Sequence, residues 1–435
     1  MKCAFYEKEI TPPIGDDIPG YFESRITDGV EDRLYAKAVV FAEDEAGPEK
    51  MAAIISLDVV NVQETFCRTV KERASAYTGI TVENIAVCAN HTHYGMPVGG
   101  AYSKRDEIYM SLMERLVADC VILAFQRLKP CTMEYGIGRE ETVAYNRDYV
   151  LRDGRIFTNP YSQRELIVRP YAGIDPDVPV LSVRDEEGTL MGVLFTYACH
   201  QDTVGDYRFS GDYSSEISHQ LKARYGAQMV SMYLAGCCGD INHVDHMGGV
   251  NRTTRQIGQI LAKEVIRVIE EASSPVDGDT IDAKYQIVTV LRRHAAPEEL
   301  EHARLAVAEP EKYLRKHEAI QHLHGLLEYE AQHTGDDEEM YLHIQILKLG
   351  EVWFFAMPGE LYHQFGVQVK EGFPGDKWLI SELSNSGLGY VAVEELYGTD
   401  IYPGKLLGET CIEPGGGKKL VKAVLKLADE IAANK

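Results

Sequence analysis

Apolar runs alternate with segments of helical periodicity along most of the chain. The apolar runs are short and contain many β-branched residues, which is typical of buried strands, whereas the segments between them place apolar residues at helical spacing. Strands are predicted at residues 51–60, 84–89, 190–200 and 229–236, and helices at residues 63–77, 107–128, 213–226 and 253–272. This alternation predicts an α/β fold with a mixed, largely buried sheet layered with helices.

Residues 296–339 differ from the rest of the chain because they are strongly charged and helical in pattern. Pro310 interrupts this segment, which predicts a helical hairpin inserted over the core. Its histidines form either a metal cluster or part of solvated helix faces. The second interpretation is favoured because no spacing repeats as ligand pairs usually do. These histidines are His302, His317, His322, His324 and His333.

The C-terminal part returns to the alternating pattern. Strands are predicted at residues 341–350, 351–359 and 377–383, a helix from Glu360, and a final helix at residues 420–433.

The composition is that of a globular protein with an acidic surface. Of the 435 residues, 45% are hydrophobic and 26% charged, and the net charge is −23. This charge repels phosphate backbones and anionic headgroups, so we expect no nucleic-acid partner and no stable membrane anchor. The chain shows no secretory stretch and no long apolar run, and its nine cysteines include no Cys-x-x-Cys pair. A cytoplasmic protein with reduced thiols is expected, although a secreted chain trimmed of its signal would have the same pattern.

Two imidazoles follow the predicted strand at residues 84–89, in the stretch Ala-Asn-His-Thr-His-Tyr-Gly. Alternate residues of a strand project from one face, so His91 and His93 are expected to point to the same side. A lone histidine there would more often be a structural hydrogen-bonding residue. Two of them before a Gly- and Pro-rich loop favour a functional site, because open α/β sheets place their sites at such strand ends.

Further candidates lie at other predicted strand ends. His200 closes the predicted strand 190–200 and is either a capping side chain or a zinc ligand, since imidazole is the commonest protein ligand for zinc. Glu360 follows Met-Pro-Gly and is either a carboxylate ligand or an acidic first-turn residue of a helix. Tyr390 and Tyr402 bracket the next such stretch and are either site residues or core aromatics.

These stretches, in this order, resemble the neutral/alkaline ceramidase family of zinc-dependent hydrolases, which cleave an N-acyl amide bond. The similar motifs cover nearly the whole chain, and their joint order and spacing carry the resemblance. They are residues 10–13 and 19–40, His-Thr-His at 91–93, Asn-Arg-Asp around Arg147, His200, Gly-Asp at 239–240, Pro-Gly-Glu ending at Glu360, and residues 390–402. The resemblance implies a single catalytic domain over residues 1–435, with residues 296–339 as an insertion within it.

The resemblance also implies a metal site with one zinc ion per chain. The implied zinc ligands are His91, His200, Glu360 and Tyr390. The residues that it places against the substrate carbonyl are His93, Arg147 and Tyr402. In the implied reaction, zinc lowers the pKa of a bound water to about 7, and this water attacks the amide. His93 and Tyr402 would stabilise the oxyanion or pass a proton to the leaving amine, and Arg147 would orient the substrate.

Two positions depart from the family pattern. Asn242 stands where the family has a serine discussed as a nucleophile, which argues against a covalent acyl route and leaves the metal route intact. Glu31 stands where the family has a histidine near the site, so altered substrate recognition is expected. The long ceramidases carry a C-terminal β-sandwich domain that this chain lacks. A small soluble amide is therefore expected as substrate, rather than the family's lipid-like N-acyl amide in a bilayer.

Several alternatives stay open from the sequence. One is a metal-dependent amidohydrolase or lactonase of another specificity. The amidohydrolase barrel would need further strand-end histidines and a late strand-end Asp, and after His200 only His243 and His246 follow in a loop. A thiol hydrolase using Cys237 or Cys238 lacks a helix N-terminus to lower the thiol pKa, so buried structural cysteines are favoured. A non-catalytic metal-binding homologue is a further alternative. An additional Ca²⁺ or Mg²⁺ ion is a further candidate cofactor, and the carboxylates considered for it are Asp212 and Asp240.

Overall fold

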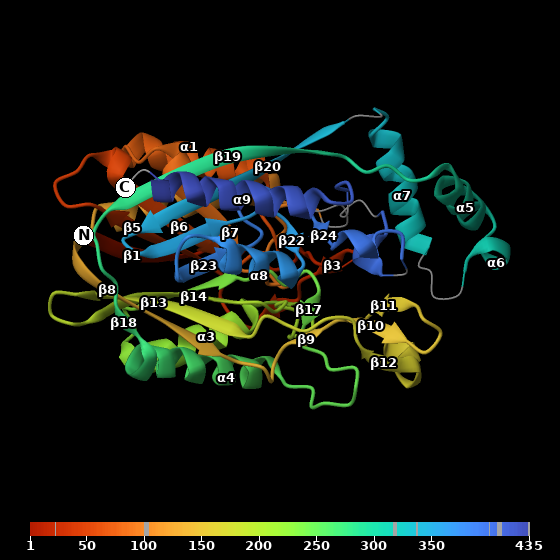
Figure 1. The fold of residues 1–435 in the computed structure, drawn as a ribbon, viewed down its shortest axis with the longest axis horizontal. Helices are drawn as coiled ribbons and strands as arrows, with labels where there is room; N and C mark the ends of the chain where they lie inside the picture. The colour runs from red at the N-terminus through yellow and green to blue at the C-terminus, as the bar shows by residue number, and fades with distance from the viewer. Residues whose placement is uncertain are drawn as a thin grey trace.

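The computed structural model describes residues 1–21, 23–99, 104–315, 320–335, 338–399, 401–406 and 411–433. A nine-stranded mixed sheet forms its centre, as predicted for an α/β fold (Figure 1). In spatial order its main path is β16 (Val230–Ala235), β14 (Leu190–Tyr197), β13 (Asp177–Asp185), β8 (Lys129–Arg139), β1 (Lys2–Glu9), β5 (Tyr35–Ala42), β6 (Met51–Leu57) and β7 (Ile85–Ala89), and β18 (Ser274–Pro275) pairs with β8. The sheet curls and brings β6 close to β16, where the Ser56 hydroxyl donates to the Tyr233 carbonyl at 2.6 Å.

A second sheet packs against the curled one. Its strands are β19 (Ile281–Leu291), β20 (Glu339–Leu349), β21 (Val352–Ala356) and β23 (Lys377–Ser381), in this order. Apolar side chains from both sheets share one buried cluster, which includes Ile54, Cys88, Leu234, Phe354 and Leu379. Strand β21 is apolar and buried along its whole length because both of its faces are covered, whereas β19 keeps charged and partly exposed residues.

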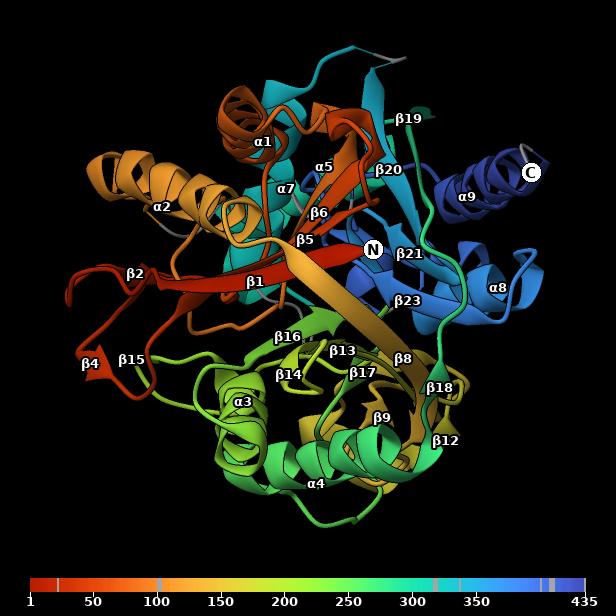
Figure 2. The ribbon, with the colours of Figure 1, turned by 90° about the vertical axis from the view of Figure 1, so that its left-hand side faces the viewer.

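Helices cover the outer faces of the two sheets (Figure 2). Helices α1 (Glu64–Thr78) and α2 (Glu107–Phe125) pack on the β1–β5–β6 side, and α3 (Asp212–Tyr225) and α4 (Thr254–Arg267) on the β13–β14–β16 side. Helices α8 (His363–Gly372) and α9 (Gly416–Ala433) cover the second sheet. None of the helices described is both long and apolar enough to cross a membrane.

Short strands join the loops around the strand ends. They are β2 (Asp17–Ile18), β3 (Arg25–Ile26), β4 (Gly29–Val30), β9 (Tyr145–Asn146), β10 (Asp148–Leu151), β11 (Ile156–Thr158), β12 (Ile167–Pro170), β15 (Arg208–Phe209), β17 (Ile241–Asn242), β22 (Glu360–Leu361) and β24 (Tyr390–Val391).

The predicted helical hairpin is present at one end of the molecule (Figure 1). It consists of α5 (Pro297–Ala308), α6 (Pro310–Tyr313) and α7 (Ile320–Gln332). Ala303 and Ala306 of α5 pack against Leu323 and Leu326 of α7 in a small apolar cluster of their own. Residues 316–319 and 336–337 of the predicted insertion, including His317, lie outside the described residues. The assignment of the whole chain to one catalytic domain stays a prediction.

Of the predicted boundaries that differ from the structure, two concern residues of the site. The strand expected at residues 190–200 ends at Tyr197, so His200 lies in the loop beyond it. The helix expected from Glu360 begins instead at His363, because Glu360 belongs to β22, which pairs in parallel with β24. Gly359 adopts a left-handed φ of 84° and turns the chain into this pairing, a conformation that favours glycine.

Candidate active site

The candidate site lies where the loops after several strands meet. His91 follows β7, His200 follows β14 and Glu360 follows β21, and each of these strands has a parallel neighbour in its sheet. The carboxyl ends of parallel strands share one edge, which is where α/β folds place their sites. The predicted residues therefore reach one place from distant parts of the sequence.

His91 and His93 reach the same site, but the expectation that they project from one face of a strand is wrong. The strand ends at Ala89, and His91 has a left-handed φ of 74°, so the two residues do not alternate along a strand. Instead, the His93 amide donates to the Gln201 carbonyl at 2.9 Å and joins this loop to the one that carries His200. A non-glycine residue in the left-handed region costs about 1–2 kcal/mol. Strain of this kind clusters at functional sites.

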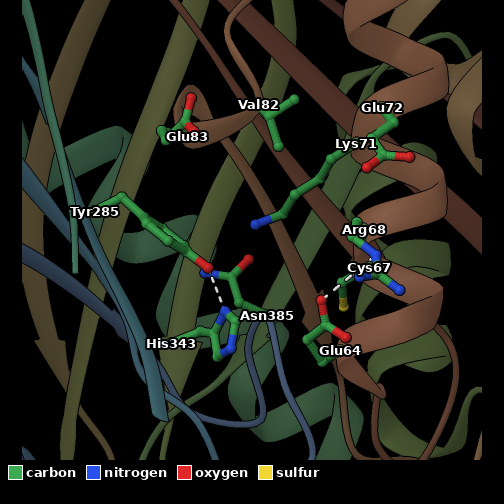
Figure 3. Close-up of a pocket in the computed structure, with 10 residues that line it drawn as sticks. All are labelled: Glu64, Cys67, Arg68, Lys71, Glu72, Val82, Glu83, Tyr285, His343 and Asn385. Atoms are coloured by element: carbon green, nitrogen blue, oxygen red, sulfur yellow. Dashed lines mark hydrogen bonds and ion pairs between the residues drawn. The ribbon is translucent and has the colours of Figure 1, made fainter. Parts of the chain in front are cut away.

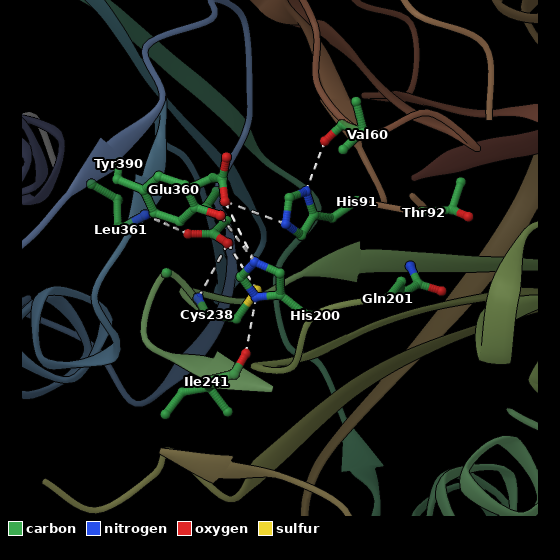
Figure 4. Close-up of polar contacts among 12 residues, drawn as sticks. Val60, His91, Thr92, His200, Gln201, Cys238, Ile241, Glu360, Leu361 and Tyr390 are labelled. Carbon is green, nitrogen blue, oxygen red and sulfur yellow. Dashed lines mark hydrogen bonds and ion pairs between the residues drawn. The ribbon is translucent and has the colours of Figure 1, made fainter. Parts of the chain in front are cut away.

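His91 and His200 present the same ring nitrogen to a common point (Figure 4). The Nδ1 atom of His91 is 2.8 Å from the Val60 carbonyl, and that of His200 is 2.9 Å from the Ile241 carbonyl. Each Nε2 atom lies 3.5 Å from Oε2 of Glu360. A histidine that donates Nδ1–H to a carbonyl holds Nε2 unprotonated, which is the usual arrangement for a metal-binding imidazole.

Tyr390 adds a fourth possible ligand atom to those of His91, His200 and Glu360. Its hydroxyl lies 3.4 Å from Nε2 of His200, and Tyr390 is the strand partner of Glu360 in the β22–β24 pair. Burial and the Glu360 carboxylate raise the pKa of Tyr390 well above its usual value. The hydroxyl is therefore neutral unless a cation stabilises the phenolate.

His93 lies beside the two other histidines. Its ring centroid is 4.9 Å from that of His91 and 5.7 Å from that of His200. Burial lowers the pKa of His93 to about 3, so its imidazole is neutral. Neither of its ring nitrogens has a hydrogen-bond partner among the described residues. One ligand nitrogen from each of the three histidines lies within 4.8 Å of the others, so His91, His93 and His200 could also hold a metal ion together.

Arg147 and Tyr402 lie against Tyr390. The Arg147 guanidinium carbon is 5.0 Å from the ring centroid of Tyr390 and 5.4 Å from that of Tyr402. The two tyrosine centroids are 5.0 Å apart in an edge-to-face arrangement. Arg147 also donates to the Gly239 carbonyl, which fixes its position. All seven residues singled out by the sequence are thus gathered in one region.

The donor set suits a divalent metal such as zinc. The buried Nε2 of His91 and Oε2 of Glu360 have no hydrogen-bond partner among the described residues. Unpartnered buried polar atoms are costly, and two nitrogens with a carboxylate and a phenol oxygen are ligands that zinc accepts. The set His91, His200, Glu360 and Tyr390 therefore fits a zinc ion.

Sequence reasoning missed the buried carboxyl group behind Glu360. Glu382 is fully buried and accepts hydrogen bonds from the Leu361 amide at 2.6 Å and the Cys238 amide at 3.1 Å. Burial raises the pKa of Glu382 well above its usual value. Glu382 directly follows β23, so the strand-end signal that singled out His200 also marks this residue.

A buried ion pair on the other side of the site was also missed. The Asp240 carboxylate accepts from Asn146 Nδ2 at 2.7 Å and from the amide and Nδ1 of His363 at 2.8 and 2.7 Å. The Arg147 amide donates to the Asp240 carbonyl at 2.8 Å. The pair therefore ties α8 to the loop that carries Arg147. No local pattern marks the pair, because Asp240, His363 and their neighbour Asn146 come from three separate segments.

The two carboxylates proposed for an additional cation are already supplied with donors. Those of Asp240 are given above, and Asp212 accepts from the Thr203 amide and hydroxyl and from the Tyr213 amide. Burial raises the pKa of Asp212 to about 7. The second cation stays a prediction with no support from these contacts.

The departures from the family pattern have local partners. Asn242 donates to the Asn159 side chain at 3.0 Å, and Glu31 pairs with Arg208. Burial raises the pKa values of Cys237 and Cys238 well above the usual range, so neither thiol is activated. Directly after α7, His333 pairs with Glu338 at 3.0 Å, so this histidine has a carboxylate partner of its own.

The fold and the clustered histidines define the class: an α/β protein with a buried site beyond the strand ends, where three histidines could hold a metal ion. Comparison with known proteins points to neutral ceramidase, and the resemblance seen in the sequence is confirmed. The chain is 22% identical over 291 residues to the neutral ceramidase of Pseudomonas aeruginosa, an alignment that covers 62% of this chain and 42% of that protein. The aligned part therefore spans less than half of that relative's length. No family model matches the chain.

Solved structures show the same fold. The crystal structure of neutral ceramidase from Pseudomonas aeruginosa matches 100% of this chain and 74% of its own, with a TM-score of 0.76 at 19% identity. The structure of a ceramidase complexed with C2 matches 100% of this chain and 75% of its own, with a TM-score of 0.74 at 18% identity.

Proposed function

We propose that this protein is a zinc-dependent hydrolase that cleaves an N-acyl amide bond. The observation that carries the proposal is the convergence of two Nε2 atoms on one buried, otherwise unpartnered oxygen of Glu360, each at 3.5 Å. The similarity to neutral ceramidase supports amide hydrolysis as the reaction. The residues proposed to hold zinc are His91, His200, Glu360 and Tyr390.

A zinc ion at this position supplies a Lewis acid that polarises a carbonyl and activates water at neutral pH. Hydrogen bonds within the protein orient the proposed ligands. Hydrogen bonds from Nδ1 to the Val60 and Ile241 carbonyls hold both imidazoles in the tautomer that leaves Nε2 unprotonated. Glu382 holds the Leu361 amide next to Glu360 and thereby fixes the carboxylate's strand.

His93, Arg147 and Tyr402 are proposed to act on the substrate. The neutral His93 imidazole has one nitrogen that can accept a proton and one that can donate, so it can move a proton to the leaving amine. The Tyr402 hydroxyl is proposed to donate to the carbonyl oxygen as negative charge develops there. Arg147, buried and fixed by Gly239, orients the two tyrosines and adds a positive charge.

The proposed substrate is a small soluble amide rather than ceramide in a bilayer. The net charge of −23 opposes approach to an anionic lipid surface. The test is a turnover screen of N-acyl amides of increasing acyl length, with lactones and short peptides as controls and ceramide vesicles as a separate arm. We expect turnover of soluble amides that a chelator abolishes and zinc restores. Turnover confined to lactones or peptides, or turnover insensitive to the chelator, would contradict the proposal.

A further inference from the structure

A cavity lies between helix α1 and the second sheet, apart from the site of the three histidines. Its volume is about 160 Å³, and its inner wall is formed by Cys67 and Lys71 of α1, Tyr285 of β19, His343 of β20, and Asn385. Val82 and the charged side chains of Glu64, Arg68, Glu72 and Glu83 line the rest. An engineered protein cavity of about 150 Å³ holds one benzene molecule, so this one has room for a ligand of similar size.

Lys71 places an unpaired amine in this cavity. The side chain points into the open space between α1 and Tyr285 (Figure 3). Lys71 is 4% exposed, and its amine makes no hydrogen bond or ion pair within the described part of the chain. Its Nζ atom lies 5.5 Å from the ring centroid of Tyr285. Burial of this kind lowers the pKa of Lys71, because a buried cation without a partner is costly.

Apart from the glutamates of the rim, the polar groups around Lys71 offer a ligand hydrogen-bond donors rather than acceptors. Asn385 accepts from the Val87 amide at 3.2 Å and donates to Gln345 at 2.9 Å, so its carbonyl oxygen is engaged. Tyr285 is hydrogen bonded to Nδ1 of His343, and burial lowers the pKa of His343. With the tyrosine hydroxyl donating, the neutral His343 carries its proton on Nε2, which is then a donor.

The acidic residues of the rim weaken the attraction of the Lys71 amine for an anion only in part. Glu64 is compensated by Arg68, whose Nε lies 3.7 Å from its carboxylate. Glu72 and Glu83 are exposed, so solvent and salt screen their charges. Lys71 is buried and screened far less. The positive charge of Lys71 would repel a metal cation. A doubly charged phosphate is also disfavoured, because only the Lys71 cation would offset its repulsion by the glutamates of the rim.

We propose that this cavity binds a small monocarboxylate with a short apolar body, whose carboxylate pairs with the Lys71 amine. The apolar body would lie against Val82, Cys67 and the Tyr285 ring. The charge-assisted hydrogen bond supplies the counter-ion that Lys71 otherwise lacks, and the volume limits the ligand to about the size of benzoate.

Benzoate is the probe for a calorimetric titration of the full-length protein. Removal of a hydrogen bond to a charged group weakens binding about tenfold or more, so we expect that loss in Lys71→Met. Lys8→Met, which removes the same charge from β1, is expected to bind benzoate as the wild type does. Benzamide, a neutral analogue of the same shape, should bind the wild type about tenfold more weakly. Equal benzoate affinity in Lys71→Met and wild type, or no saturable binding to the folded wild type, would overturn the proposal.

A second measurement needs no variant and locates the bound probe. Acetic anhydride labels accessible amines, and mass spectrometry gives the labelling rate of each lysine. Saturating benzoate is expected to slow the labelling of Lys71 and to leave that of Lys8 unchanged. An unchanged rate at Lys71 would overturn the proposal, including the case in which benzoate binds only at the zinc site. Neither measurement depends on hydrolysis.

Discussion

Single residues at the candidate site are held by partners outside the seven residues expected to bind zinc or act on the substrate. The Asp240–His363 pair shows this most clearly. The Asp240 side chain is fully buried, and its carboxylate accepts hydrogen bonds from the Asn146 side chain and from the backbone amide and ring of His363. Through the Asp240 carbonyl it also fixes the backbone of Arg147. The position of Arg147, which is proposed to act on the substrate, thus depends on the Asp240–His363 pair, whose members lie far from it in sequence.

This pair predicts a pH-dependent contribution to stability. Burial lowers the pKa of His363, but the Asp240 carboxylate more than offsets this and raises the pKa above its usual value of about 6.5. The stabilisation is complete below the unfolded-state pKa and is lost as the pH rises through the higher folded-state pKa. We expect the difference in free energy of unfolding between wild type and His363→Gln to be larger at about pH 6 than at about pH 9. Urea titrations at both pH values measure it, and a difference that grows with pH would contradict the assignment.

At the scale of elements, the site depends on close approach between the loop after β16 and strand β22. Gly239 lies in that loop, and a Cβ atom added there would be 2.5 Å from the backbone oxygen of Glu360. Only glycine lets the two segments meet, so the position of the Glu360 carboxylate depends on the absence of a side chain at residue 239.

Gly239→Ala is therefore expected to displace β22. We expect a loss of about 1–3 kcal/mol in the free energy of unfolding, as for other overpacked sites, together with weaker zinc binding. Gly335→Ala is the matched control, because nothing lies within 4 Å of a Cβ atom added there. Denaturant unfolding and zinc titration of both variants measure the effect. Wild-type zinc affinity in Gly239→Ala would show that the approach of these loops does not position the ligand.

The elements themselves were largely predictable, and their pairing was not. Apolar runs and helical spacing predicted β7, β14, α1 and α2, because burial imposes those patterns locally. The same patterns placed His200 and Glu360 near strand ends. The pairing of β22 with β24, which sets Glu360 beside Tyr390, joins residues thirty positions apart and has no local signal. The left-handed turn at His91 was likewise unpredictable, since it depends on contacts with the β6 and β14 loops.

At the scale of the whole molecule, two packed sheets covered by helices hold the site in the loops at their strand ends, and the net charge is strongly negative. The net charge of −23 acts over the whole surface, so it bears on how the molecule approaches other charged bodies rather than on the chemistry.

This charge predicts weak association with anionic membranes. We expect no co-sedimentation with phosphatidylserine vesicles at low salt, where repulsion between like charges is least screened. Phosphatidylcholine vesicles serve as the uncharged comparison. Strong binding to the anionic vesicles would show that a surface patch binds the membrane despite the net charge. It would then favour ceramide in a bilayer as the substrate.

The central claim is that His91 belongs to the metal site whereas His93 acts on the substrate. The most direct test is the zinc content of purified wild type, His91→Ala and His93→Ala, measured by elemental analysis beside amide turnover, with circular dichroism to show that each is folded. We predict about one zinc ion per chain in wild type and in His93→Ala, and little in His91→Ala. Turnover should fall about 10²–10⁴-fold in His93→Ala despite its zinc. Loss of zinc from His93→Ala as complete as from His91→Ala would contradict the account and assign the ion to the three histidines together.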